Sequence, residues 1–440
     1  MSTVTCKRLA VVLVAAAVVF TGLLVGGVFR ESSAASPAVA PQVTTGLDSE
    51  FTFGASAGET VLRLQETLRS NPSDQRSWAL LGLAYQQRAR DTADPGYYGK
   101  SERALRKALS LEPNDALAIS GLGSLALARH RFREALEFGR KAVALGPYTA
   151  RHYGVVGDAL IELGRYRAAF AAFDRMAGLR PSISSYARVS YGRELIGHTR
   201  AAIRAMQLAV DAAGVAPEPA AWARVQLAKL YWNHGRLNAA ARELRLALAA
   251  FPGYAYALDA LAQVEWARGH RRVALALAQR AVAGVPLPQY AAQLGDLYRA
   301  SGRPTLARRQ YALIGAIERL LNAGGVKTDL ELALFQVDHA VRLEEALARA
   351  RRAHADRPSI DADDVLAWAL TRTGRCGEAL SFSQLALRLG TQDALKFFHR
   401  GMIERCLGRH AVARMWLRRA LALNPHFSVL WGPAARRLAG

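Results

Sequence analysis

The stretch YGVVGDALIELGRYRAAFAAFDRMAGLRP, from Tyr153 to Pro181, places small residues at fixed offsets among apolar ones. Gly157 lies inside a first amphipathic segment. Gly164, seven residues later, ends that segment because glycine tolerates a left-handed turn. A second amphipathic segment follows, with Ala169 on its apolar face, and Pro181 stops it. The stretch therefore predicts two short helices joined by a tight turn.

The same small residues recur along the chain at a period of about 34 residues. Three further stretches carry them: Gly123, Ala135, Ala142 and Pro147; Gly269, Ala274, Ala281 and Pro286; Gly401, Gly408, Ala413, Ala420 and Pro425. Two antiparallel helices approach closely only where small residues lie at the crossing, and one pair alone leaves an apolar face uncovered. We therefore expect an all-α array of stacked helix pairs, with about ten units that begin near residues 75, 116, 150, 183, 221, 255, 288, 327, 360 and 394.

Two stretches carry a more specific motif. WALLGLAY, from Trp78 to Tyr85, has the spacing W-x2-L-G-x2-Y, and the stretch from Leu294 to Tyr311 repeats Leu-Gly and Tyr at the same offsets. These motifs and the sustained period resemble the tetratricopeptide repeat (TPR) family. The resemblance implies a right-handed α-solenoid of stacked antiparallel helix pairs, whose first helices line a concave groove that takes extended peptides or partner helices. Two units depart from the pattern: the first has DTADPGYY inserted between its helices, and the unit near residue 327 lacks the glycine between its helices.

The composition divides the chain into three parts. Residues 58–440 form the predicted solenoid, with a half-repeat at its start and a capping helix within HFSVLWGPAARRLAG at its end. Residues 31–57 are rich in Ser, Ala, Pro, Gly and Thr and predict a flexible linker. Residues 1–30 hold a short charged stub followed by an apolar segment, so we expect one hydrophobic helix before the solenoid.

The apolar segment, residues 9–29, contains 21 residues without a charge, which is enough to span a bilayer as a helix. Lys7 and Arg8 precede it, and this favours a cytoplasmic N-terminus and an extracytoplasmic solenoid in a single-pass membrane protein. Two alternatives remain open. In the first, the segment is a signal peptide cleaved near the small residues SSAAS, and the protein is secreted. In the second, the segment is an apolar helix buried in a soluble fold, and the protein is neither anchored in a membrane nor secreted.

The formal net charge of +22 favours contact with polyanions such as RNA, wall polymers or anionic lipid. The last units carry a dense basic set: Lys396, Arg400, Arg405, Arg409, Arg414, Arg418, Arg419, Arg436 and Arg437. The alternative is that these residues only keep solvated helix faces soluble. Nucleic acid requires a cytoplasmic domain, which the charges beside residues 9–29 disfavour, so RNA is not the expected partner.

Exposed positions on the first helices of the middle units carry many aromatic and polar residues. They are Trp222, Lys229, Trp232, Asn233, Tyr256, Asp259, Gln263 and Trp266. Aromatic residues are over-represented where binding energy concentrates, so this set predicts a groove patch for a peptide or partner protein. The alternative is packing within the chain. By contrast, the consensus positions Trp78, Tyr85, Tyr231 and Tyr298 are expected in the core.

No residue pattern predicts catalysis, a cofactor or a metal site. The histidines are scattered along the chain. No spacing in the sequence indicates a pair of nucleophile and general base, and no Cys/His cluster has the spacing of a zinc site. The acidic trio Asp361, Asp363 and Asp364 lies at an expected helix N-terminus, which favours a role in complementing the helix dipole over calcium binding. The sequence therefore favours a non-catalytic interaction scaffold, with an anionic polymer on the basic surface as the alternative.

Two of the three cysteines lie in neighbouring units. Cys376 is expected to begin the second helix of one unit, and Cys406 to end the first helix of the next. Because these helices pack antiparallel, the two thiols face each other and can form a disulfide if the solenoid lies outside the cytoplasm. Two buried free thiols are the alternative.

Overall fold

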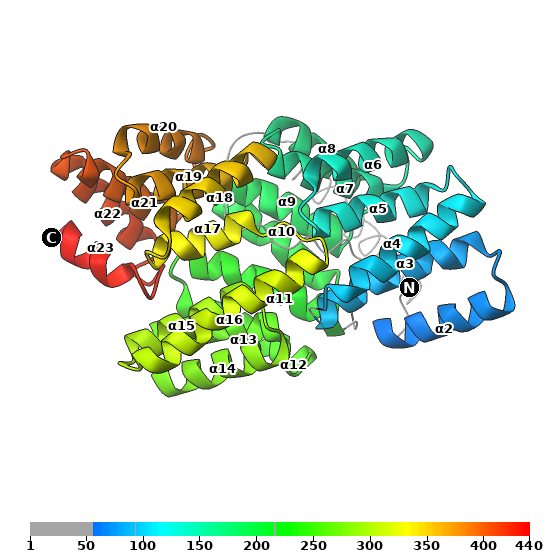
Figure 1. Cartoon of the computed structure of the whole chain (residues 1–440), viewed down its shortest axis with the longest axis horizontal. Helices are drawn as coiled ribbons and strands as arrows, with labels where there is room; N and C mark the ends of the chain where they lie inside the picture. Colours follow the sequence, from blue (N-terminus) through cyan, green and yellow to red (C-terminus); the bar gives the residue numbers. More distant parts are fainter. Residues whose placement is uncertain (1–55, 93, 215–216) are drawn as a thin grey trace, which may run out of the picture. The chain divides into compact units, whose positions relative to one another are not determined.

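The computed structural model describes residues 56–92, 94–214 and 217–440, which form 22 helices and no strand (Figure 1). The predicted hydrophobic helix at residues 9–29 and residues 31–55 of the predicted linker lie outside the described residues. Among the described helices, none has the length and apolar content that crossing a membrane requires.

Twenty of these helices form ten pairs, each with a first and a second helix joined by a short turn. The pairs are α3 (Gln75–Thr92) and α4 (Gly96–Leu111), α5 (Ala116–Ala128) and α6 (Phe132–Leu145), α7 (Ala150–Glu162) and α8 (Tyr166–Leu179), α9 (Ile183–Leu195) and α10 (Thr199–Asp211), α11 (Pro217–Asn233) and α12 (Leu237–Ala250), α13 (Ala255–Ala267) and α14 (Arg271–Gly284), α15 (Pro288–Ala300) and α16 (Pro304–Ala323), α17 (Asp329–Asp338) and α18 (Leu343–Asp356), α19 (Ile360–Arg372) and α20 (Cys376–Ala386), and α21 (Ala394–Cys406) and α22 (His410–Leu423). A single helix, α2 (Ala57–Ser70), precedes them and α23 (Gly432–Ala439) follows them. The predicted array of stacked pairs is confirmed, and every first helix begins close to its predicted start.

Gly157 and Gly164 explain why the α7–α8 pair forms. A Cβ atom at Gly157 would lie 2.3 Å from Cε1 of Phe173 on α8, so the helices approach this closely only with glycine at the crossing. Gly164 follows α7 with a φ of +68°, in the left-handed region that glycine adopts without strain, and α8 then begins at Tyr166. The close crossing and the tight turn thus come from the spacing of two glycines.

The two units that depart from the repeat pattern form their turns differently. The stretch DTADPGYY was predicted as an insertion between helices, and this prediction was wrong, because α3 extends through Thr92 and α4 begins at Gly96. In the unit near residue 327, Ala340 and Arg342 take φ values of 55° and 47°, and His130 takes 56° in the α5–α6 turn, where most other units use glycine. A left-handed conformation at a residue with a side chain costs about 1 kcal/mol, so this turn is stabilised by the helices around it.

The hydrophobic core runs between the helix pairs. Its largest cluster extends from Ala187 on α9 to Ala307 on α16 and includes Tyr231 and Tyr298. Tyr85 is buried in a separate cluster, and Trp78 is half-buried between that cluster and its neighbour. The predicted core positions are therefore confirmed for the three tyrosines, and Trp78 lies at the edge of the core.

Several hydrogen bonds join helix pairs that are far apart in the sequence. Arg129 Nε donates to the Gly324 carbonyl oxygen at 3.0 Å, the backbone N–H of Ile360 donates to Tyr166 Oη at 2.7 Å, and Asn424 Nδ2 donates to the Trp232 carbonyl oxygen at 2.8 Å. The partners in these three bonds are separated by 192 to 195 residues along the chain. Pairs five or six units apart therefore touch, and the inner face of the array is partly closed by the chain itself.

Candidate binding cavity

A cavity of about 490 Å³ lies on the inner side of the array. Its walls come mainly from first helices, namely α11, α13, α15 and α17, and are completed by the start of α21 and by residues 424–429. First helices face inward because the second helix of each pair covers the outside, as the resemblance implies. The cavity is thus built from consecutive repeats and closed by repeats from the end of the chain.

Seven of the eight residues predicted as a groove patch line this cavity. They are Trp222, Lys229, Trp232, Asn233, Tyr256, Asp259 and Gln263. Their burial differs from the prediction of an exposed patch: only 7% of Trp222 is exposed, and the other six are partly buried. Trp222 is a member of the largest core cluster, so packing within the chain accounts for at least this tryptophan.

Trp266, the eighth predicted residue, does not line the cavity. It lies in the last turn of α13 and packs partly buried against the largest core cluster. The guanidinium of Arg271 lies 5.3 Å from the centre of its ring. The cavity ends before this turn of α13, so Trp266 serves as a comparison residue outside the site.

A row of aromatic residues crosses the cavity wall at intervals of 34 residues: Trp222, Tyr256 and Tyr290. The rings of Tyr256 and Tyr290 meet edge to face, with centroids 6.1 Å apart. Tyr254 packs beside them and donates its hydroxyl to Glu218 Oε1 at 2.9 Å. Tyr254, Tyr290 and Glu218 were missed from the sequence, although the interval of 34 residues would have indicated Tyr290.

A charged group on three adjacent first helices surrounds Lys229. Its ammonium lies near the carboxyl groups of Asp259 and Glu194, and in the part of the chain that the structure describes it forms no hydrogen bond. Asn233 Nδ2 donates to Glu194 Oε1 at 3.0 Å, and Gln293 Nε2 donates to Asp259 Oδ1 at 2.8 Å. Burial outweighs the attraction of the two carboxyl groups and lowers the pKa of Lys229. The ammonium therefore has hydrogen-bond donors left for a ligand.

Burial also acts on the two carboxyl groups. It raises the pKa of Asp259 to about 8 and that of Glu194 to about 8, against the opposing attraction of Lys229. In an unfolded chain such groups ionise near pH 4. Between these values the unfolded state binds fewer protons than the folded state, so this pair lowers stability as the pH rises from about 4 to about 8.

We expect Asp259→Asn to remove half of this pH dependence. The amide keeps an oxygen acceptor for Gln293 and is neutral at every pH, so the variant gains on the order of 2 kcal/mol over the wild type between pH 5 and pH 8. Urea unfolding followed by circular dichroism at both pH values measures this difference. Parallel pH profiles for the two proteins would contradict the prediction.

His339 was also missed from the sequence, and it forms a second ionic contact at the cavity wall. Nε2 lies 2.8 Å from Asp296 Oδ1, and Nδ1 lies 2.8 Å from the Phe335 carbonyl oxygen. These hydrogen bonds outweigh burial and raise the pKa of His339. Both ring nitrogens are used, so His339 fixes α17 against α15 and has no donor left for a ligand.

Part of the predicted basic set at the C-terminus is used inside the fold. Lys396 is buried, with Nζ 2.6 Å from Asp361 Oδ1 and 3.7 Å from Asp393 Oδ2. Arg400 and Arg409 both pair with the buried carboxylate of Glu404. Lys396 is therefore used inside the fold, Arg400 is partly buried beside its partner, and Arg409 pairs with Glu404 while staying exposed.

Each carboxylate of the acidic trio contacts a different partner side chain. Asp361 pairs with Lys396, Asp363 pairs with His354 and Arg388, and Asp364 Oδ2 lies 2.9 Å from His399 Nδ1. The prediction of a role limited to the helix dipole was therefore incomplete, because each carboxylate has its own cationic or histidine partner. Within the described ranges, no group of His, Cys, Asp or Glu side chains is placed to hold a metal ion.

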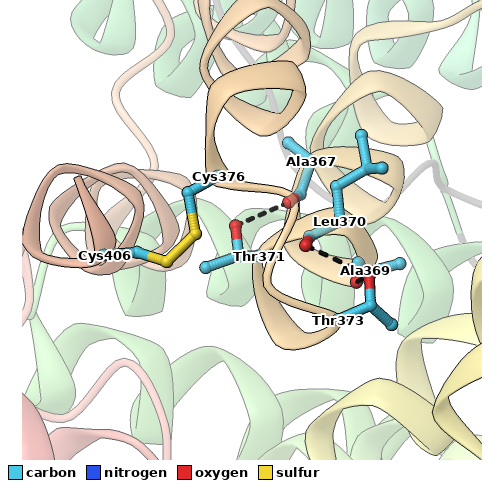
Figure 2. Close-up of a disulfide and its surroundings, with 7 residues drawn as sticks. All are labelled: Ala367, Ala369, Leu370, Thr371, Thr373, Cys376 and Cys406. Atoms are coloured by element: carbon cyan, nitrogen blue, oxygen red, sulfur yellow. Dashed lines mark hydrogen bonds between the residues drawn. A yellow bond between two sulfur atoms is a disulfide. The ribbon is translucent and has the colours of Figure 1, made fainter.

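Cys376 and Cys406 are joined by a disulfide with a Cα–Cα distance of 6.1 Å (Figure 2). Cys376 is the first residue of α20 and Cys406 the last residue of α21, which are the positions that the repeat pattern predicts. Beside Cys376, the turn after α19 is held by Thr371 and Thr373, whose hydroxyls donate to carbonyl oxygens of the same helix. The disulfide thus ties the turn of one unit to the end of the next first helix.

A comparison with protein families matches residues 87–150 to the tetratricopeptide repeat. Among curated proteins, the chain is 29% identical over 205 residues to Cellulose synthase 1 operon protein C of Komagataeibacter xylinus. The match covers 46% of this chain and 13% of that protein, so the chain corresponds to a small part of its relative.

Several solved structures are similar in fold. YrrB, described as a TPR protein with an unusual peptide-binding site, is 20% identical with a TM-score of 0.30, covering 46% of this chain and 99% of its own. The human IFIT1 dimer with PPP-AAAA is 13% identical with a TM-score of 0.48, covering 88% and 96% of the two chains. A TPR protein from Parabacteroides merdae is 15% identical with a TM-score of 0.40, covering 61% and 99%. What these proteins bind says nothing about the ligand of this chain.

Proposed function

We propose that this chain, a solenoid of repeats that resemble the tetratricopeptide repeat, is a non-catalytic scaffold that binds a short segment of a partner protein in the cavity. Tetratricopeptide repeats indicate a protein–protein interaction scaffold. The observation that carries the finer proposal is the wall shared by α11 and α13. There, Trp232 and Tyr256 lie beside Lys229 and Gln263, whose polar groups form no hydrogen bond within the described residues.

The volume of the cavity limits what the partner can insert. One turn of α-helix, about 10–12 Å wide and 5.4 Å long, occupies roughly 500 Å³. The cavity of about 490 Å³ therefore holds one such turn, or a few residues of extended chain. Asn424 and Trp232, from distant pairs, are joined by a hydrogen bond at the wall of this cavity.

Replacing Trp232 with alanine is expected to weaken capture of the partner at least about 30-fold, because buried tryptophans at such contacts contribute about 2 kcal/mol or more. The measurement uses the full chain in its native cells with a photo-cross-linking amino acid at Gln263, which faces the cavity. A cross-linked species that forms from Gln263, and disappears on Trp232→Ala, supports the proposal.

Two controls define the outcome. The same cross-linker at Ala276, exposed on α14, reports contacts with the outside of the array. Trp266→Ala removes a tryptophan that lies on the next first helix, α13, but outside the cavity. This variant should leave cross-linking from Gln263 unchanged. Equal cross-linking from Gln263 and Ala276, or equal loss with both tryptophan variants, rejects a partner segment in the cavity.

We further propose that the solenoid lies outside the cytoplasm. The uncharged stretch at residues 9–29 after Lys7 and Arg8 supports this location, as does the disulfide, because disulfides persist in oxidising compartments. Alkylation of intact cells without a reductant, followed by mass spectrometry, should recover Cys376 and Cys406 as one linked peptide. Two separately alkylated cysteines would contradict this location.

Proteins of polysaccharide synthesis are the first partners to test. The curated relative is named for a cellulose synthase operon, and this is the reason for the proposal. The cross-linked species from Gln263 identifies the partner directly by mass spectrometry.

A further inference from the structure

The positive charge of this chain belongs to the solenoid. Residues 1–55 contain three basic and three acidic residues, so the whole excess of +22 lies in the rest of the chain. Several carboxylates of first helices are buried, among them Glu265, Asp363 and Asp364. Exposed arginines, by contrast, are frequent on second helices, which form the outer side of the pairs.

Three consecutive second helices, α12, α14 and α16, present an outer face without an unpaired carboxylate. α14 contains no acidic residue. Glu243 on α12 is buried and pairs with Arg224 at 2.9 Å, and Glu318 on α16 pairs with Arg349 at 2.8 Å. Four exposed arginines form no ion pair or hydrogen bond in the described part of the chain: Arg272, Arg280, Arg309 and Arg319.

Large apolar side chains are exposed on the same three helices. The exposed fractions are 43% for Leu246, 51% for Val273, 43% for Leu313 and 52% for Leu320. Leu313 and Leu320 follow Arg309 by four and eleven residues, so this cation and both leucines share one side of α16, and Arg319 lies about 100° around the helix from Leu320. Val273 and Arg280, seven residues apart, share one side of α14 in the same way.

We propose that the outer face of α12, α14 and α16 binds the surface of a membrane that contains anionic lipid (Figure 1). The guanidinium groups contact lipid phosphates, and Leu246, Val273, Leu313 and Leu320 enter the boundary between headgroups and acyl chains. The proposal concerns the outside of the array and does not depend on a ligand in the cavity.

The exposed leucines favour a lipid surface over a soluble polyanion. A polymer of phosphates is bound by arginines alone, and it gives exposed leucine and valine no apolar surroundings. α22 offers a contrast, because its Arg418 donates to the Ala439 carbonyl oxygen and its Arg419 lies over the ring of Phe397. On α14 and α16, by contrast, Arg272, Arg280, Arg309 and Arg319 make no such contact within the described residues and remain free for headgroups.

The test measures the reactivity of individual arginines toward phenylglyoxal in the full chain by mass spectrometry. Vesicles of phosphatidylcholine with phosphatidylglycerol are compared with vesicles of phosphatidylcholine alone. We expect the anionic vesicles to slow modification of Arg272, Arg280, Arg309 and Arg319 at least about fivefold. Arg103 on α4 and Arg140 on α6, which are equally exposed, should react unchanged. Insertion of residues 9–29 affects both vesicle types alike, so the difference reports the outer face.

A variant separates lipid from polymer. Leu313→Ser with Leu320→Ser changes two exposed positions and should reduce the protection by anionic vesicles at least about threefold, because the apolar contribution is lost. Protection by soluble polyphosphate, used as a separate probe, should be unaffected by the two serines. The proposal is overturned if phosphatidylcholine alone protects equally, if all exposed arginines are protected alike, or if the serine variant keeps full protection on anionic vesicles.

Discussion

Replacing Gly157 with leucine should lower the free energy of unfolding by about 3 kcal/mol, near the upper end for overpacking a protein core. The reason is the distance of 2.3 Å between a Cβ at this position and Cε1 of Phe173, which requires α7 and α8 to move apart. In a repeat array each pair stabilises its neighbours, so the damage is expected first in this pair and the pairs beside it. Urea unfolding measures the total loss, and hydrogen exchange of peptides from α7 and α8 locates it.

Gly178 on α8 provides the matched control. A Cβ there meets no atom within 4 Å, and the residue has ordinary helical geometry. Gly178→Ala is therefore expected to raise stability by about 0.5 kcal/mol, because alanine restricts the unfolded chain more than glycine does. If Gly157→Leu proved as harmless as Gly178→Ala, close packing at the crossing would not be what holds this pair together.

Replacing Lys396 with methionine is expected to lower the free energy of unfolding by about 3–5 kcal/mol, the usual result of removing one partner from a buried ion pair. Methionine keeps most of the volume but leaves Asp361, Asp393 and Asp364 without the cation they surround. The pKa values of Asp393 and Asp364 then rise, because both lose the attraction of the Lys396 ammonium. The destabilisation should shrink as the pH falls from 7 toward 4 and the groups become protonated.

Two further variants test the origin of that effect. Lys396→Met combined with Asp361→Asn removes one of the uncompensated charges and should recover part of the lost stability at pH 7. Arg405→Met changes an exposed cation on the same helix and should alter stability by no more than about 0.5 kcal/mol. A loss for Lys396→Met that is independent of pH, with no recovery in the double variant, would assign the effect to packing alone.

The positions of most cavity residues could be predicted from the sequence because each repeat presents the same helix positions to the inside. Trp232 and Gln263 were found in this way, and the interval of 34 residues from Trp222 through Tyr256 would have extended the row to Tyr290. Trp266 was predicted beside them but does not line the cavity, whose last residue on α13 is Val264. The sequence repeat does not show at which turn of a helix the cavity-lining positions end.

Glu194 and His339 were missed for a different reason. Their roles depend on neighbours from other helices: Asn233 and Lys229 for Glu194, and Asp296 for His339. A sequence shows that a charged residue occurs on a helix, but burial and the approach of a second helix decide whether its pKa moves. The burial of Lys396, which looked like one of many surface cations, follows the same rule.

The sequence by itself determined the helix pairs, their turns and their order, because these depend on contacts between residues within about 34 positions of each other. It also placed Cys376 and Cys406 at helix ends that meet. Only the tertiary structure decided that Tyr166 meets Ile360 and that Trp232 meets Asn424 at the cavity wall. Such contacts depend on the rotation from each pair to the next, summed over five or six pairs. Small differences in packing at each step add up, and no local pattern in the sequence records their total.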